Sequence, residues 1–297
     1  MIAGLVDTVL PTLRSTEVLH GVASKSRSNI RFMDMGTTWI RYCITGDRGP
    51  TIVLNTDPPS TIESYDQTID QLSRYFRVIT FEVPGFGFSF PKKLNFQFDF
   101  ESITTTLSQF LIALDLGPYI LSFPCVLGFS AIKIANIYPD LVSHIVLNQV
   151  PSWQGVLDWR TGRDSKGILT KPILGQMALQ MLKQKRVGPW FDLVIPEQKK
   201  AQELTKQALW AFKHGACFSL ASCFQFYITE QMPDLQPVKQ PSLIIWGECD
   251  GSHQQTDKSK TRELTLDYEE LYLPNIGHSP EIETPAIFAE AINKLVI

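Results

Sequence analysis

The sequence predicts an α/β fold with a mostly parallel, eight-stranded sheet, flanking helices and one inserted helical segment. Short apolar segments alternate with helical patterns up to residue 150. The alternation stops between Pro151 and Pro237, where helical patterns follow one another, and it resumes in residues 238–297. Because parallel strands need a crossover connection that is usually a helix, this alternation indicates a parallel sheet.

Residues 1–30 are expected to form a helix and a linker ahead of the core. Met1–Leu13 is apolar at helical spacing, but Asp7 interrupts it and no basic residue precedes it, unlike a signal peptide. We expect an amphipathic helix that packs on its own domain or on a partner subunit, with membrane contact as a weaker alternative. Ser15–Ser28 is polar and is expected to be a mobile linker. No apolar run approaches the length of a transmembrane helix.

The core is expected to comprise residues 31–150 and 238–297. Its predicted strands are Arg31–Met35, Trp39–Thr45, Thr51–Asn55, Arg77–Val83, Tyr119–Pro124, His144–Val150, Ser242–Gly247 and Tyr268–Leu273. Its predicted helices are Tyr65–Phe76, Phe98–Leu116, Val126–Tyr138 and Pro285–Leu295.

Residues 151–237 are expected to form a helical cap, or lid, with helices at Ile168–Lys183, Gln198–Lys213 and Ala216–Glu230. The segment is rich in aromatic residues, most of which are expected to form its own core. Some should nevertheless face the site that the cap covers, which predicts an apolar substrate pocket. Trp159 and Trp210 are the candidate substrate-binding residues from this segment.

Cys125 stands at the turn between a predicted strand and a predicted helix, where a nucleophile is expected. Such a turn exposes a side chain at the carboxyl edge of the sheet, and the helix N-terminus behind it favours an anion. One alternative is a buried, inert cysteine. Another is Ser130 in Gly128–Ser130 as nucleophile, but no strand ends directly before it, and it stands only nine residues before Pro139.

A carboxylate and a histidine follow two later strands. Asp250 comes just after Ser242–Gly247, and His278 lies in the Gly277–Pro280 loop that follows the last strand. The chain order is therefore nucleophile, acid, base, with each residue after a strand. Three such side chains can meet in space although they are far apart in sequence.

On these residues the chain resembles the α/β-hydrolase superfamily from about Arg31 to Ile297. The segments that carry the resemblance are Trp246–Asp250, Gly277–Pro280 with Glu283 and Pro285, and Pro84–Ser89. The resemblance implies the α/β-hydrolase fold, a Cys125–His278–Asp250 triad, and an oxyanion hole made by the backbone N–H groups of Asp57 and Val126. A cysteine nucleophile is similar to that of dienelactone hydrolases and polyhydroxyalkanoate synthases.

Three features depart from the family pattern. Phe123 and Leu127 stand where small residues usually flank the nucleophile, although Gly128 falls on the family's second elbow glycine. Asn55-Thr56-Asp57-Pro58 replaces the common His-Gly sequence after the third strand. The third departure is the cysteine itself.

These residues predict acyl chemistry. His278 would take the thiol proton, Asp250 would orient His278, and Cys125 would attack an acyl carbonyl to form an acyl-cysteine. The thiolate is expected to be favoured by His278 and by the helix N-terminus. Hydrolysis, transfer and cyclisation all remain open as outcomes. The alternatives are non-acyl catalysis on the same scaffold, as in a C–C hydrolase, lyase or cofactor-free oxygenase, and a non-catalytic binding protein.

Bulk properties limit the partners. The net charge of −3 and a pI near 6.0 indicate no overall basic field for nucleic acid or an anionic membrane. Five cysteines without framework spacing indicate a reducing, cytoplasmic location. No metal-ligand spacing or phosphate loop occurs, so no metal or cofactor is expected. The expected partner is an apolar small-molecule or carrier-bound acyl substrate, with no nucleic acid and no stable membrane insertion, and homo-oligomer formation stays open.

Overall fold

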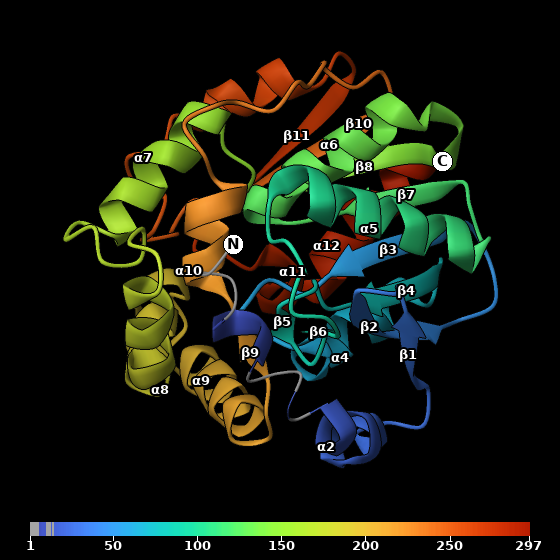
Figure 1. Ribbon diagram of the computed structural model, residues 1–297. Helices are drawn as coiled ribbons and strands as arrows, with labels where there is room; N and C mark the ends of the chain where they lie inside the picture. Colours follow the sequence, from blue (N-terminus) through green and yellow to red (C-terminus); the bar gives the residue numbers. More distant parts are fainter. Residues whose placement is uncertain (1–5, 10–12, 14) are drawn as a thin grey trace.

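The central sheet is mostly parallel and has helices on both faces. The computed structural model describes residues 6–9, 13 and 15–297, and within them the sheet has nine strands. Eight of them lie side by side in the order β1 (Ile30–Asp34), β2 (Thr38–Thr45), β4 (Arg77–Phe81), β3 (Thr51–Asn55), β7 (Tyr119–Ser122), β8 (Val142–Asn148), β10 (Ser242–Gly247) and β11 (Tyr268–Leu273) (Figure 1). Only the pairs of β2 with β1, β4 and the two-residue β6 (Phe90–Pro91) are antiparallel in this sheet. The predicted eight-stranded, mostly parallel sheet is confirmed.

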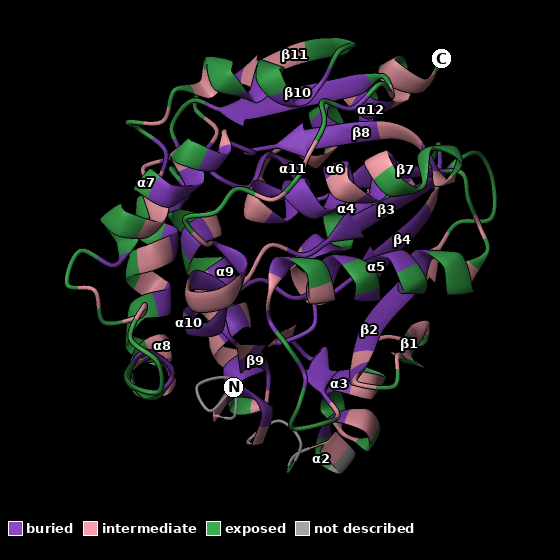
Figure 2. Cartoon of the chain, turned by 45° about the horizontal axis from the view of Figure 1, so that its top comes forward, coloured by how far each residue is buried: buried purple, intermediate pink, exposed green. Residues whose placement is uncertain are grey.

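Both faces of the sheet are buried, which explains why its strands are continuous apolar runs. All five residues of β3 are buried. Ile52 and Leu54 pack in the cluster that contains α4 (Asp66–Leu72) and α12 (Pro285–Val296). Val53 faces the other way, into the cluster that contains α5 (Phe100–Leu114) and α6 (Gly128–Ile137). Figure 2 shows the resulting buried layer between exposed helix surfaces.

The segment between β8 and β10 contributes helices beyond the carboxyl ends of the parallel strands (Figure 1). They are α7 (Trp153–Arg163), α8 (Leu174–Val194), α9 (Gln198–Lys213), α10 (Leu220–Ser222) and the π-helical η4 (Cys223–Tyr227). A short strand, β9 (Cys217–Phe218), pairs with β5 (Phe86–Gly87) of the core. The predicted helix Ala216–Glu230 is therefore wrong as one continuous element.

Helix α8 is also longer than predicted, because it continues through Pro189. A proline inside a helix costs about 3 kcal/mol and removes one hydrogen bond. The turns around Pro189 bury Val187, Phe191 and Val194 in the core cluster. This burial offsets the local cost, which a sequence pattern alone does not show.

Short elements complete the chain. They are η1 (Ile62–Tyr65), η2 (Cys125–Leu127), η3 (Pro139–Leu141), η5 (Lys258–Leu264) and α11 (Pro280–Glu283).

Residues Ser15–Ser28, which the sequence predicts to be a linker, include two short helices, α2 (Ser15–His20) and α3 (Val22–Lys25). The buried Arg41 holds this segment, donating from Nε and Nη2 to the Ala23 carbonyl at 3.2 and 2.8 Å. Glu82 accepts from Arg41 at 2.6 Å. Of the predicted helix Met1–Leu13, residues 1–5 and 10–12 lie outside the described residues, and residues 6–9 are helical.

Candidate active site

Cys125 lies in a strained turn between β7 and α6. Its φ of 52° is in the left-handed region, which is uncommon for a residue with a Cβ and concentrates at functional sites. The turn brings α6 so near the sheet that a Cβ on Gly128 would lie 2.5 Å from a Val150 methyl carbon. Phe123 is accommodated by the core, where its ring packs against Phe81 with centroids 5.4 Å apart. Phe123 and Leu127, the bulky residues on either side of Cys125, therefore pack in the core and are compatible with the tight turn.

His278 and Asp250 lie beside Cys125. His278 Nδ1 is 2.5 Å from Asp250 Oδ2, and the Cys125 thiol lies near enough to the imidazole for each group to shift the pKa of the other. Asp250 Oδ1 accepts from the Ser252 backbone N–H and hydroxyl, both at 2.8 Å, which fixes the carboxylate. The structure thus brings together the three residues that the sequence proposed as a triad.

Asp57 approaches the histidine from its other side. Asp57 Oδ2 is 3.0 Å from His278 Nε2, so both ring nitrogens face a carboxylate. The Asp57 backbone N–H, expected in the oxyanion hole, donates to the Tyr65 hydroxyl at 2.9 Å. The backbone N–H of Val126, the other expected donor, interacts with the Cys125 sulfur.

A buried polar chain continues behind Asp57. Tyr65 donates to Glu281 Oε1 at 2.9 Å, and Asn148 donates to Glu281 Oε2 at 2.5 Å. Burial raises the pKa of Glu281 to about 7. Sequence reasoning missed these three residues, because they come from distant elements and show no spacing pattern.

Charge and burial have opposite effects on the pKa of His278 at this site. Burial alone would lower the pKa of His278, but the charge of Asp250 and the hydrogen bonds to Asp250, Asp57 and Cys125 raise it well above its ordinary range. Burial raises the pKa of Cys125 and outweighs the hydrogen bond from His278. The expected thiolate is therefore not the resting form. The resting site instead holds an imidazolium between two carboxylates, beside a neutral thiol.

His253 extends the site with an aromatic stack. Its ring lies parallel to that of His278, with 5.5 Å between centroids and 5° between planes. Burial, followed by the charge of His278, lowers the pKa of His253 to about 3, so its ring is neutral. The donor atoms of Asp250, His253 and His278 lie within 4.8 Å of one another. However, a metal ion binds in the plane of each imidazole, and one ion cannot lie in the planes of two stacked rings.

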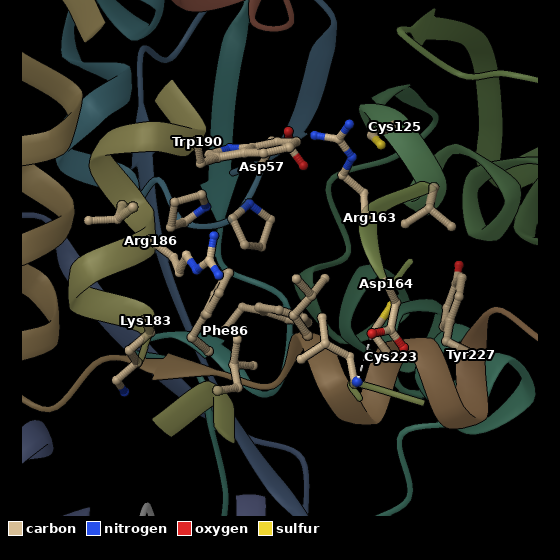
Figure 3. Close-up of a pocket in the computed structure, with 18 of the residues that line it drawn as sticks. Asp57, Phe86, Cys125, Arg163, Asp164, Lys183, Arg186, Trp190, Cys223 and Tyr227 are labelled. Carbon is tan, nitrogen blue, oxygen red and sulfur yellow. Dashed lines mark hydrogen bonds between the residues drawn. The ribbon is translucent and has the colours of Figure 1, made fainter. Parts of the chain in front are cut away.

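A cavity of about 630 Å³ opens between the sheet edge and the inserted helices. Cys125, Asp57 and His278 lie on its core side, and most other lining residues are apolar. Figure 3 shows Arg163, Lys183 and Arg186 among the side chains that line it from the inserted helices.

The two candidate tryptophans differ. Trp159 lines the cavity, whereas Trp210 does not and packs edge-on against Phe88 at 6.0 Å. Trp190, which the sequence did not single out, lines the cavity and meets the His278 ring edge-on at 5.9 Å. Trp159, Trp190 and Trp210 lie on three different helices, and the sequence alone could not show which of them face the site.

Ser130, the competing nucleophile, is buried inside α6. Its hydroxyl lies 2.7 Å from that of Thr104 and 2.6 Å from that of Tyr227. Ser130 therefore contacts two hydroxyl groups. Cys125 is the candidate nucleophile that lies beside His278.

Known proteins share this architecture. Epoxide hydrolase A from Mycobacterium thermoresistibile superposes with a TM-score of 0.73 at 15% identity, covering 90% of this chain and 97% of that one. Bromoperoxidase from Bacillus anthracis gives a TM-score of 0.69 at 15% identity, covering 90% of this chain and 99% of that one. The chain has the α/β-hydrolase fold.

Sequence similarity is weaker than structural similarity. Epoxide hydrolase 3 from Xenopus tropicalis is 21% identical over 293 residues, which cover 93% of this chain and 76% of that protein. No protein-family model matches the chain. At these identities the similarity to known structures extends to the fold alone.

The site predicts an unusual order of thiol reactivity. Cys249 is exposed, whereas Cys43, Cys125, Cys217 and Cys223 are buried. Since burial also raises the pKa of Cys125, iodoacetamide at neutral pH should label Cys249 first. Peptide mass mapping over time would measure the order, with Cys249→Ser as the control that removes the fast phase. Faster labelling of Cys125 than of Cys249 at neutral pH would contradict the neutral resting thiol.

Proposed function

We propose that this chain is an enzyme that acts on an apolar acyl ester or thioester through an acyl-cysteine intermediate at Cys125. The observation that carries the proposal is the left-handed turn that holds Cys125 beside His278 at the floor of an apolar cavity. Strained backbone at the end of a strand, with a base within reach, is the arrangement expected of a covalent nucleophile.

The reaction would proceed in two halves. Neutral His278 takes the thiol proton, and the sulfur attacks the acyl carbonyl carbon to form a tetrahedral oxyanion. The oxyanion collapses, the C–O or C–S bond to the leaving group breaks, and His278 returns the proton to that group. Water, an alcohol or a thiol then attacks the acyl-cysteine with the same proton transfers in reverse. Asp250 holds the imidazolium that forms in each half.

The oxyanion needs two backbone N–H donors, and in the resting site the N–H of Asp57 already donates to the Tyr65 hydroxyl. The Asp57 N–H would have to exchange the Tyr65 hydroxyl for the substrate oxygen, and Val126 would supply the second N–H. The Asp57 carboxylate must also leave His278 Nε2 before that nitrogen can accept the thiol proton. Substrate binding and base activation are therefore coupled through Asp57.

A second candidate function follows from the same Asp57 contact. A carboxylate 3.0 Å from the catalytic base could itself transfer protons in a non-acyl reaction, such as C–C bond hydrolysis, a lyase reaction or cofactor-free oxygenation. The structurally similar proteins include an epoxide hydrolase and a bromoperoxidase, which agrees with varied chemistry on this fold. A non-catalytic binding role is the third alternative, and the strained Cys125 and its ordered histidine argue against it.

We further propose that residues 151–237 act as the cap over this cavity. The helices of this segment supply much of the cavity wall, including Trp159 and Trp190. An apolar wall facing a buried nucleophile suits an acyl chain and keeps bulk water away from the acyl-cysteine.

The variant Asp57→Asn distinguishes acyl transfer through Cys125 from a non-acyl reaction in which Asp57 transfers protons. Asp57 raises the pKa of His278 through a hydrogen bond and that of Cys125 through its charge, so its removal should lower both. Because acyl transfer needs neutral His278, kcat/KM should rise with pH. In Asp57→Asn, the midpoint of that rise should move to lower pH, with equal or higher activity at pH 7.

The comparison uses Asp70→Asn, on the exposed side of α4, as the control that should leave the pH profile unchanged. If Asp57 itself transfers protons, Asp57→Asn should instead lose roughly 10²–10⁴-fold in kcat at every pH. That loss in a folded variant would exclude the simple acyl mechanism.

The cap proposal predicts that two tryptophans behave differently. Trp159→Ala should change KM for long or aromatic acyl groups relative to acetyl, because Trp159 lines the cavity. Trp210→Ala is the matched control, since it removes a ring that packs on Phe88 away from the cavity. It should lower the melting temperature and leave the selectivity unchanged. Equal selectivity changes in both variants would contradict the assigned cavity wall.

A further inference from the structure

The outer side of α8 carries large apolar side chains that are exposed to solvent. Leu174, Met177, Met181 and Leu182 are all exposed, and Met181 retains 77% of its accessible surface. Their spacing of three, four and one residues places them along one side of the helix. Single exposed apolar residues are common, but a row of four on one helix is a patch that is typical of a binding surface.

The same region is strongly basic. Between Arg160 and Arg186 the chain has seven basic residues and one acidic residue, Asp164. The Asp164 carboxylate accepts hydrogen bonds from the backbone N–H groups of Ile168, Leu169 and Thr170. It therefore holds the loop in place and does not form an ion pair with one of the basic residues.

Two of the seven cations are engaged within the protein. Arg160 pairs with Glu230, and Lys183 lies over the Phe212 ring. The other five are exposed, and among the residues that the structure describes none of them has a carboxylate within ion-pair distance. They are Arg163, Lys166, Lys171, Lys185 and Arg186. The net charge of −3 for the whole chain conceals this local concentration.

The cavity opens within this basic and apolar surface. Arg163, Lys166, Ile168, Leu182 and Arg186 are exposed and also line the cavity. Figure 3 shows Arg163 and Arg186 reaching the cavity from different helices of the inserted segment. The cavity wall therefore shares three exposed cations and one residue of the apolar row, Leu182, with the outer surface.

We propose that this surface, Arg163–Arg186, docks reversibly on an anionic lipid surface and admits the apolar substrate from there. Protruding apolar side chains can enter the interface while the lysines and arginines contact acidic headgroups. The chain has no helix, among the residues described, with both the length and the apolar character needed to cross a bilayer, so the contact would be peripheral. Docking itself does not depend on Cys125, whereas substrate delivery rests on the proposed acyl chemistry.

A lipid surface fits these features better than a protein partner does. A symmetric dimer would place the same five cations of two copies against each other, which is unfavourable. A helical peptide partner needs a groove, and Met177 and Met181 protrude from the convex side of a helix.

Vesicle sedimentation tests the proposal. The intact chain should bind vesicles of phosphatidylcholine mixed with phosphatidylglycerol, bind weakly to phosphatidylcholine alone, and dissociate as salt rises. Lys171→Glu and Lys185→Glu should each weaken binding to the mixed vesicles by about five-fold or more, since a basic residue at such a surface contributes about 1 kcal/mol. Met177→Ser with Met181→Ser should weaken it as well. None of these four residues lines the cavity.

The controls are matched in exposure and lie elsewhere. Lys239→Glu and Leu266→Ser change exposed residues near β10 and β11, and they should bind like the unaltered chain. Equal binding to both vesicle types, no binding to either, or equal loss in the controls would overturn the proposal. A concentration-dependent dimer abolished by Met181→Ser would overturn it in favour of self-association. Cys125→Ala should still bind vesicles, so a failed acyl mechanism and a failed docking surface give different results.

Discussion

His278 lies buried between Asp250 at Nδ1 and Asp57 at Nε2, and this pair of contacts raises the pKa of the imidazole against the effect of its burial. Two carboxylates stabilise the imidazolium in a place where burial would otherwise expel its proton. The nearby thiol stays neutral because the same burial disfavours a thiolate. The resting site is therefore an ion cluster, which the proposed reaction at Cys125 would have to rearrange.

Two further buried carboxyl groups lie near His278, and burial affects their ionisation as well. Glu281 and Glu283 are also buried nearby, and burial raises the pKa of each to about 7. A rise from 4.5 to about 7 corresponds to about 3 kcal/mol that the fold contributes against ionisation. Partial protonation of these two carboxyl groups limits the negative charge around His278. Burial and the charge of His278 lower the pKa of His253, so the ring stacked on His278 is neutral.

Local patterns predicted the fold and the three residues that meet around His278, but they could not reveal contacts between distant segments. Cys125, Asp250 and His278 each follow a strand, and a sequence shows such positions directly. The role of Tyr65 depends on a hydrogen bond to Asp57 and another to Glu281, 216 residues away. Likewise, Arg41 orders a segment that reads as a linker, because its partner carbonyl belongs to Ala23.

The inserted helices show a further limit of sequence patterns. Trp159, Trp190 and Trp210 have the same chemistry, and only packing separates the two that line the cavity from the one that does not. The basic surface around α8 was hidden by a near-neutral whole-chain charge, because its cations are concentrated between Arg160 and Arg186. Charge summed over a chain therefore indicates little about a single face.

Acid-quenched mass spectrometry of the enzyme with activated medium-chain esters and thioesters tests the central claim most directly. A covalent mechanism predicts a mass increase of one acyl group on the peptide that contains Cys125. The adduct should disappear in Cys125→Ala and persist in Cys223→Ala, whose thiol lines the same cavity. Turnover by Cys125→Ala, or an adduct on Asp57 instead of Cys125, would contradict the account.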